Sequence, residues 1–178
     1  AVAEVTGIKN ILKNAAGRTR ALEGLDDASG VVIGAAPDGP IAVTMNGATY
    51  MADLIGGQKT GLFFDQRPNH EFISRLSKGA RVLDVFSHVG GFGLAALANG
   101  ASSALAVDGS VPALELATQG AVAAGFGDKF STRKGDAFDV LTSLRAEGAQ
   151  FDVIVCDPPA FAPSRQALEA GLRAYERI

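Results

Sequence analysis

Apolar and polar positions alternate in blocks along the second half of the chain. From Arg81 onward, short apolar runs are separated by longer segments in which apolar residues recur at helical spacing. The runs that predict strands are 81–86, 103–107, a weaker run at 130–134, and 151–156. The segments that predict helices are 91–99, 111–124 with Ser110 as its N-cap, 137–146, and a closing helix that Ser164 would cap. This alternation is typical of a parallel sheet with right-handed crossover connections.

The first 55 residues have a different pattern. Short apolar runs at 3–8, 31–33, 41–45 and 48–54 are separated by turn residues, which include the hairpin dipeptide Asn46-Gly47. Such spacing predicts a small antiparallel β appendage. A Gly-rich segment follows, and residues 71–77 read as a short helix that packs Phe72, Ile73 and Leu76. We therefore expect three parts: a β-hairpin subdomain (1–55), a flap with a linker helix (56–79) and a partial α/β domain with a doubly wound parallel sheet (80–178).

The last expected strand raises a packing problem. Val153, Ile154 and Val155 are apolar on both faces, as in a central parallel strand. If the strand order is 3-2-1-4, this strand is an exposed apolar edge, which natural proteins avoid. We expect that the chain is a fragment, or that another chain, such as a second copy in a homo-oligomer, covers this edge.

Composition limits the function classes. The chain has 178 residues, 47% hydrophobic and 20% charged, which is ordinary for one globular domain. Its formal net charge of −3 gives no general attraction to a polyanion, so nucleic-acid binding would need local basic patches. One cysteine excludes an internal disulfide, and one cysteine with two histidines predicts no structural metal site. We see no signal peptide or membrane span and expect a cytoplasmic protein.

The candidate chemistry lies after the strand 81–86, where a glycine cluster opens a helix. Neither the Walker A spacing nor the dinucleotide fingerprint G-x-G-x-x-G fits here. Instead, Asp84 lies within the strand, and Asp108 ends the next strand, where a carboxylate can bind ribose hydroxyls. An acidic strand residue suits a ligand ammonium, and a ligand with both an amino acid and a ribose is S-adenosylmethionine. The alternative is a generic strand–turn–helix connection with an incidental Asp84.

Five segments occur in an order that resembles a known family: GQKTGLFFDQR (57–67), LDVFSHVGGFG (83–93), VDGS (107–110), GDAF (135–138) and FDVIVCDPPAF (151–161). Together they resemble class I S-adenosylmethionine-dependent RNA methyltransferases, and most closely the bacterial 23S ribosomal RNA cytosine-C5 subgroup. The resemblance implies a Rossmann-like sheet, S-adenosylmethionine as cofactor and ribosomal RNA as substrate. That subgroup also has a PUA domain and a catalytic cysteine beyond the Asp-Pro-Pro helix, and neither is found in this chain.

The resemblance also implies roles for individual residues. Asp84 would lie near the methionine ammonium, and Asp108 would accept hydrogen bonds from the ribose. Asp136 would accept from the adenine amine, although Asp108 and Asp136 could each simply cap a helix. The remaining expected cofactor-binding residues are Phe63, Asp65, Gln66, Arg67, Phe86, Ser87, Gly90, Gly91, Phe92, Gly109, Ser110, Ala137 and Asp157. Of these, Phe63 to Arg67 would form a flap together with Lys59, yet Arg67 and Lys59 could equally be solvated charges.

The catalytic residues implied by the resemblance are Asp157, Pro158 and Pro159. Two prolines fix the backbone and remove its donors, so this loop could hold a flipped base by its edge. Phe161 could stack on the base or belong to the core, and Cys156 reads as a small core residue, not as a nucleophile. Three alternatives stay open: a nicotinamide dehydrogenase, a domain that binds the cofactor without catalysis, and an amino-group methyltransferase.

Overall fold

A computed structural model describes residues 1–15, 20, 22–26, 28–57, 61–162 and 164–178. Contacts group the chain into two compact units. The first contains residues 1–41 and 53–61, and the second contains residues 42–52 and 62–178. The hairpin at 42–52 thus belongs to the same unit as the sheet. The expected domain boundaries at residues 55 and 79 stay a prediction.

The first unit contains a short helix, α1 (Val2–Thr6), and two antiparallel strands, β1 (Ile11–Lys13) and β2 (Gly30–Ile33). The expected strand at 3–8 is therefore wrong. The segment forms one helical turn, which ends at Gly7 in the left-handed conformation with φ of 70°. Glycine reaches this conformation without strain and ends helices for that reason, so it stops the turn before an extended strand can form.

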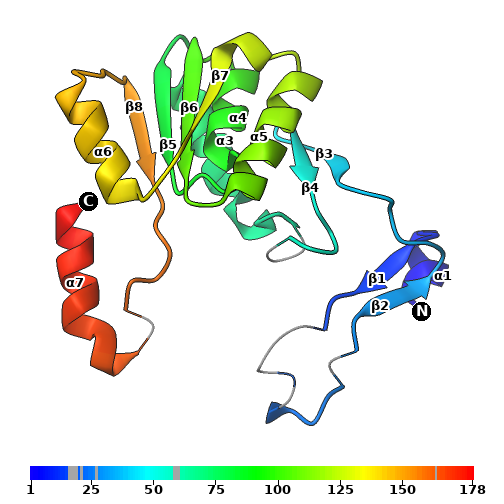
Figure 1. Ribbon diagram of the computed structural model, residues 1–178. Helices are drawn as coiled ribbons and strands as arrows, with labels where there is room; N and C mark the ends of the chain where they lie inside the picture. Colours follow the sequence, from blue (N-terminus) through cyan, green and yellow to red (C-terminus); the bar gives the residue numbers. More distant parts are fainter. Residues whose placement is uncertain (16–19, 21, 27, 58–60, 163) are drawn as a thin grey trace. The chain divides into compact units, whose positions relative to one another are not determined.

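The second unit is built on a four-stranded parallel sheet with the order β7-β6-β5-β8 (Figure 1). Its strands are β5 (Arg81–Val85), β6 (Ser103–Asp108), β7 (Phe130–Lys134) and β8 (Val153–Cys156). This is the expected 3-2-1-4 order, and the predicted α/β fold is confirmed. Ile154 of the edge strand β8 is 61% exposed. That another chain covers this edge stays a prediction.

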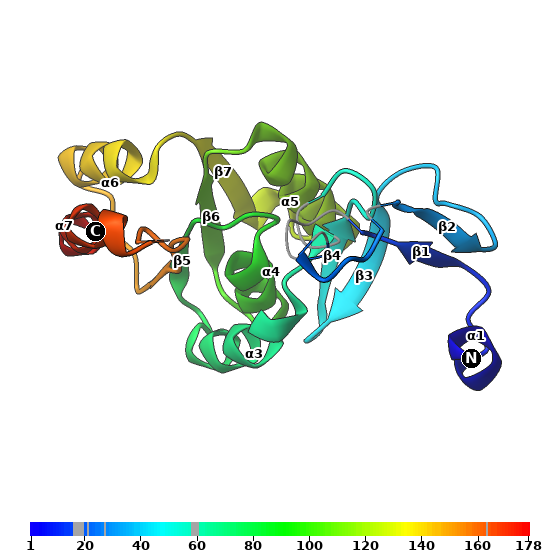
Figure 2. The same cartoon turned by 90° about the horizontal axis from the view of Figure 1, so that it is seen from below.

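Helices cover both faces of this sheet (Figures 1 and 2). On one face lie α3 (Arg67–Leu76), α4 (Gly91–Ala98) and α5 (Val111–Ala123), and on the other lies α6 (Ala137–Ala146). Helix α7 (Leu168–Arg177) lies beyond the carboxyl ends of the strands, past the end of α6 (Figure 1). Short 3-10 turns, η2 (Phe64–Gln66), η3 (Gly127–Lys129) and η4 (Arg165–Ala167), join these elements. The hairpin of β3 (Ile41–Met45) and β4 (Ala48–Ala52) turns at Asn46 and Gly47, both with positive φ, as Asn-Gly predicted.

The hydrophobic core lies between the sheet and its helices. On the α6 face, Leu83, Val85 and Val107 pack against α6, whose buried residues are Ala137, Val140 and Leu144. On the opposite face α4 is almost entirely buried, because it is apolar around its whole circumference. Packing on both faces of the sheet holds β5 in its interior. The candidate site lies at the carboxyl end of this strand.

Two helices leave large apolar side chains exposed and bury smaller or polar residues instead. In α3, Phe72 and Leu76 are 62% and 60% exposed, whereas His70 and Ser74 are buried. The hydroxyls of Ser74 and Ser77 donate to carbonyls within α3, which makes their burial possible.

Helix α7 buries Gly171 and leaves Leu168, Leu172 and Tyr175 between 43% and 53% exposed. A Cβ on Gly171 would lie 2.6 Å from Cβ of Ala162, so the helix approaches the preceding loop closely at this residue. The predicted capping by Ser164 is also wrong. Ser164 precedes η4 and makes no side-chain cap bond.

Candidate cofactor and acceptor site

The glycine turn between β5 and α4 has an unusual backbone. Phe86 and His88 both have positive φ, 62° and 49°, which side chains other than glycine rarely adopt. Gly90 has φ of 79°, and a Cβ built on this residue would lie within 3.4 Å of three side chains. Strain of this kind persists only where the surrounding structure over-determines it, and it gathers at ligand sites.

Asp84 lies beneath this turn. Its Oδ2 accepts a hydrogen bond from the backbone N–H of Gly93 at 2.9 Å, whereas Oδ1 has no hydrogen-bond partner among the described residues. Burial raises the pKa of Asp84 to about 7, against the lowering effect of the Gly93 and Phe92 N–H groups. An oxygen without a partner in a buried site is the acceptor that a ligand group could use, directly or through water.

Asp108 connects two loops at the carboxyl edge of the sheet. Its Oδ2 accepts from the N–H of His88 and its Oδ1 from the N–H of Ser110, both at 2.8 Å. Ser110 in turn caps α5 by accepting from the N–H of Ala113, as predicted. A carboxylate has about four acceptor positions, so Asp108 retains capacity for ribose hydroxyls. Gly109 lies beside the next loop, since its Cβ position is 3.9 Å from the carbonyl oxygen of Gly135.

Asp136 caps α6. Its Oδ1 accepts from the N–H groups of Phe138 and Asp139 at 2.9 and 3.4 Å. Capping of this helix is the alternative role that the sequence left open for Asp136. A contact between Asp136 and adenine stays a prediction. Ala137 is buried in the core, so only its backbone could contribute to a site.

The Asp157-Pro158-Pro159 loop begins beside β5. The N–H of Asp157 points to the carbonyl of Val85 at 3.4 Å, and its Oδ2 accepts from Nε2 of Gln66 at 3.1 Å. Burial first, and then the neighbouring Asp157, raises the pKa of the Cys156 thiol. Cys156 packs against the hydrophobic core cluster, as the interpretation of Cys156 as a core residue predicts.

Phe161 is at the centre of an aromatic cluster. Its ring lies 6.1 Å from that of Phe86, 6.0 Å from that of Phe138 and 4.8 Å from that of Tyr175. The Tyr175 hydroxyl accepts from the N–H of Phe161 at 3.2 Å. The cluster joins the loop after β8 to α7 and to the glycine turn.

The predicted flap divides among different neighbours. The ring of Phe63 lies edge-on to His88 at 5.2 Å, and Gln66 reaches Asp157. Arg67 turns to the β3–β4 hairpin instead, where its Nε donates to Oδ1 of Asn46 at 3.3 Å. Asp65 is exposed. The predicted flap residue Lys59 lies outside the described residues.

Phe92 of α4 packs against α3. It is buried, and its ring packs against His70 of α3 with the centroids 4.5 Å apart. α4 thus turns this side chain toward α3, and a contact between Phe92 and the cofactor stays a prediction.

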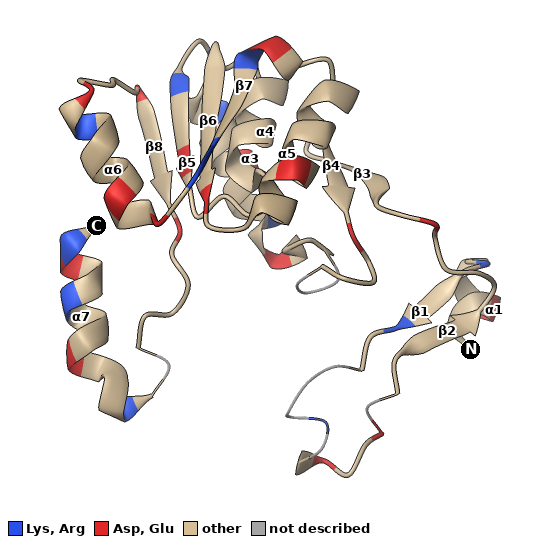
Figure 3. Cartoon of the chain, viewed as in Figure 1, with Lys and Arg blue, Asp and Glu red and all other residues tan. Residues whose placement is uncertain are grey.

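Acidic residues gather at the carboxyl ends of β5, β6 and β8 (Figure 3). The carboxylates of Asp108 and Asp157 each raise the pKa of Asp84 further. Such mutual repulsion is relieved by a cationic ligand. Among the described residues, no group of three or more His, Cys, Asp or Glu could hold a metal ion. Nor is any helix in the described ranges long and apolar enough to cross a membrane.

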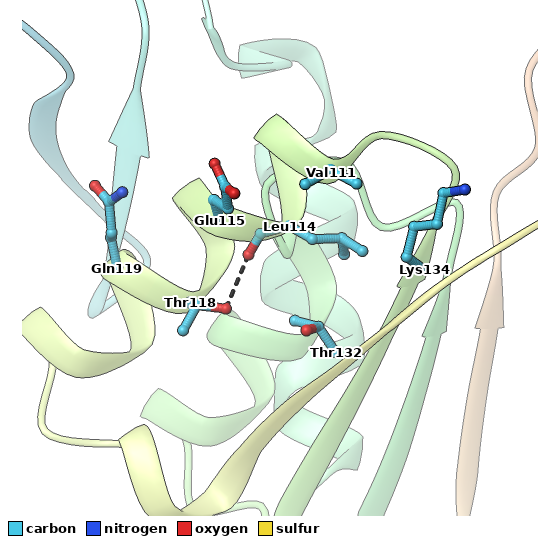
Figure 4. Close-up of a pocket in the computed structure, with 7 residues that line it drawn as sticks. All are labelled: Val111, Leu114, Glu115, Thr118, Gln119, Thr132 and Lys134. Carbon is cyan, nitrogen blue, oxygen red and sulfur yellow. Dashed lines mark hydrogen bonds between the residues drawn. The ribbon is translucent and has the colours of Figure 1, made fainter.

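A separate surface pocket of about 350 Å³ lies between α5 and β7 (Figure 4). It is lined by Val111, Leu114, Glu115, Thr118, Gln119, Thr132 and Lys134. None of the predicted site residues lines it, although Val111 directly follows the predicted residue Ser110.

The sequence signature of the S-adenosylmethionine-dependent methyltransferase family matches residues 17–178. The chain belongs to this family. The family resemblance and S-adenosylmethionine as the family's methyl donor are thereby confirmed. A crystal structure of a protein named as a methyltransferase, complexed with SAH, matches with a TM-score of 0.68 and 27% identity over 78% of this chain and 37% of that one. The methyltransferase of Agrobacterium tumefaciens gives a TM-score of 0.71 at 21% identity, over 91% of this chain and 50% of that one, and shows the fold alone.

Curated relatives with similar sequences are named ribosomal RNA large subunit methyltransferase I. The protein of Aeromonas salmonicida is 40% identical over 89% of this chain and 40% of its own length. That of Vibrio vulnificus is 36% identical over 100% of this chain and 46% of its own length. The chain thus spans less than half the length of the curated relatives it matches.

The residues of this site fit the family's cofactor. Asp84 Oδ1 and the hydroxyl of Ser87 are buried polar atoms without partners among the described residues, and both flank the glycine turn. Asp108 keeps acceptor capacity at the end of β6. An ammonium and a ribose can satisfy such a set of acceptors.

Sequence reasoning missed several residues at this site: Asn46, Tyr50, His70, His88 and Tyr175. Tyr50 and Gly91 are 41 residues apart, and their hydrogen bond has no local signal in the sequence. Two signals for these residues were available in the sequence: a tyrosine in a largely apolar strand and a histidine in a short helix.

Proposed function

We propose that this protein transfers a methyl group from S-adenosylmethionine to a base of large-subunit ribosomal RNA in the cytoplasm, with a cytosine as the first candidate. The names of its curated relatives support the RNA substrate. Because the chain covers less than half of those proteins, its own activity and substrate are part of the proposal.

One observation carries the proposal. The Asp157-Pro158-Pro159 loop and the glycine turn meet at the carboxyl ends of the adjacent strands β5 and β8. Asp157 contacts the β5 backbone and Gln66, and Phe161 contacts Phe86. A donor held by the glycine turn and an acceptor held by the loop would therefore share one edge of the sheet.

On the donor side, Asp84 would face the ammonium and Asp108 the ribose hydroxyls. Ser87, Gly90 and Gly91 would contribute polar groups of the turn, and further contacts are proposed for Phe63, Gln66, Phe86, Gly109, Ser110, Asp136 and Ala137. When bound, the cofactor supplies a methyl group on a positively charged sulfur. The residues of the chain need only bind, orient and exclude water, because the donor is already activated.

On the acceptor side, Asp157 offers a carboxylate, and Pro158 and Pro159 form a backbone without N–H donors. These groups would accept from the edge of a base and hold it in a fixed position. The Phe161 cluster supports the loop from behind.

A C5 methylation of cytosine needs a thiolate that attacks C6. Cys156 is the only cysteine in this sequence, and its raised pKa favours the neutral thiol. The Asp157-Pro158-Pro159 loop, with its carboxylate and its backbone without N–H donors, supports a second candidate, in which an exocyclic amine accepts the methyl group between Asp157 and the prolines. A domain that binds the cofactor without catalysis is the remaining alternative.

Incubation of the protein with large-subunit ribosomal RNA and cofactor labelled in the methyl group tests the proposal. We expect label in RNA, and mass spectrometry of the nucleosides distinguishes C5 from amino methylation. Asp157→Ala should lower incorporation about 100-fold or more, since misplacement of the acceptor by about 1 Å is enough. The control Asp128→Ala, on an exposed 3-10 turn, should retain it. Heat of SAH binding without label in any RNA would overturn the transfer and support the binding-only alternative.

A further inference from the structure

Two ring residues lie directly behind the glycine turn, outside the set that would contact donor or acceptor. Tyr50 of β4 is fully buried, and His70 of α3 is 6% exposed. Their rings stack with centroids 6.1 Å apart and an interplanar angle of 27°. Both come from elements that precede the sheet in the sequence, and neither residue belongs to the five segments that resemble the family.

Tyr50 holds the turn by a hydrogen bond. Its hydroxyl donates to the carbonyl oxygen of Gly91 at 3.1 Å. Gly91 is the first residue of α4, so this bond fixes the peptide at which the turn becomes a helix. Burial raises the pKa of Tyr50, and the carboxylate of Asp84 raises it further, so the hydroxyl keeps its proton and remains a donor.

His70 holds the same residue by contact. A Cβ on Gly91 would lie 2.7 Å from Nε2 of His70 and 2.8 Å from its Cε1. The His70 ring also packs edge-on against Phe92. His70 therefore fills the direction in which a Cβ on Gly91 would point.

The histidine is held neutral. Burial lowers the pKa of His70 to about 4, and its Nδ1 has no partner among the described residues. A neutral ring can pack between Tyr50 and Phe92 without bringing a charge beneath the turn.

We infer that Tyr50 and His70 are positioning residues for the cofactor: the hydroxyl and the imidazole ring together hold Gly91, and thereby set the shape of the turn that binds the donor. The inference rests on the proposed function of this turn. On this inference, the β3–β4 hairpin and α3 shape the cofactor site, although neither element contacts the cofactor.

Calorimetric titration with SAH tests the inference. Tyr50→Phe removes only the hydroxyl, and the affinity for SAH should fall about three- to tenfold, or about 0.6 to 1.4 kcal/mol. The matched control is Ser77→Ala, which removes another fully buried hydroxyl whose bond stays within α3. Each substitution removes a buried hydrogen bond and should lower the free energy of unfolding, so only a loss of affinity confined to Tyr50→Phe supports a positioning role. Equal affinity in Tyr50→Phe and the wild type, or an equal loss in Ser77→Ala, overturns it.

A suppressor pair gives a second measurement if Tyr50→Phe folds poorly. Gly91→Ala places a methyl group against His70 and should weaken SAH binding. Gly91→Ala combined with His70→Ala makes room for that methyl and should recover most of the lost affinity. If the double variant binds no better than Gly91→Ala, the methyl group blocks the ligand itself and the inference for His70 is wrong. A wild-type protein that gives no heat with SAH refutes the proposed function, and the inference falls with it.

Discussion

Asp84 should lower the stability of the free protein at neutral and alkaline pH, and its replacement by asparagine should restore that stability. Burial raises the pKa of Asp84 from 3.8 to about 7. The folded state therefore holds the proton more tightly than the unfolded state, and the free energy of unfolding falls as the pH rises from about 4 to 7. A shift of about three units corresponds to about 4 kcal/mol above pH 7.

Asp84→Asn keeps an acceptor oxygen for the N–H of Gly93 and removes the charge. Urea unfolding followed by far-ultraviolet circular dichroism should show the variant to be more stable than the wild type by up to about 4 kcal/mol at pH 8. Near pH 4 the two proteins should be equally stable. Asp152→Asn is the control, because Asp152 lies in an exposed ion pair with Arg81 that lowers its pKa, and it should gain nothing at pH 8.

Parallel stability curves of the wild type and Asp84→Asn from pH 5 to 8 would refute this reasoning. The same protein preparation gives a second readout. If the charged form of Asp84 receives the ammonium, SAH affinity of the wild type should rise with pH through about 7, and Asp84→Asn should bind weakly at every pH.

Three further perturbations follow from the geometry. Because burial lowers the pKa of His70 to about 4, the unfolded state binds this proton first, and the contribution of His70 to the free energy of unfolding should fall by about 2 kcal/mol from pH 7 to pH 5, opposite in sign to that of Asp84. In urea unfolding, His70→Gln should therefore gain about 2 kcal/mol relative to the wild type between these two pH values. Tyr175→Phe removes the hydroxyl that accepts from Phe161, so methyl transfer should slow severalfold while SAH affinity in calorimetry stays unchanged; equal losses in both would contradict a role on the acceptor side. Gly120→Ala places a Cβ 2.8 Å from the carbonyl oxygen of Thr49 and should cost about 1 to 3 kcal/mol in the same unfolding assay; a neutral effect would show that the hairpin can shift without cost.

The sequence alone determined the order of elements from β5 to β8 and the place of the glycine turn. Each of these elements is specified by neighbouring residues: apolar runs give the strands, Ser110 and Asp136 cap the next helices, and Asn46-Gly47 gives the hairpin turn. Local signals of this kind survive folding because the tertiary structure reinforces them. For the same reason the order of strands and helices along the chain was enough to place the carboxylates at the strand ends on one edge of the sheet.

Tertiary structure decided which faces are buried and which residues support the turn. Local periodicity assigned Phe72 to the core, whereas packing against α4 buries His70 and Ser74. The bond from Tyr50 to Gly91 and the contact between Phe161 and Phe86 join residues far apart in the chain. Such contacts depend on how whole elements pack, and a window of neighbouring residues carries no information about them. The position of Asp84 in the sequence suggested its chemistry, but its burial, which raises its pKa, exists only in the folded protein.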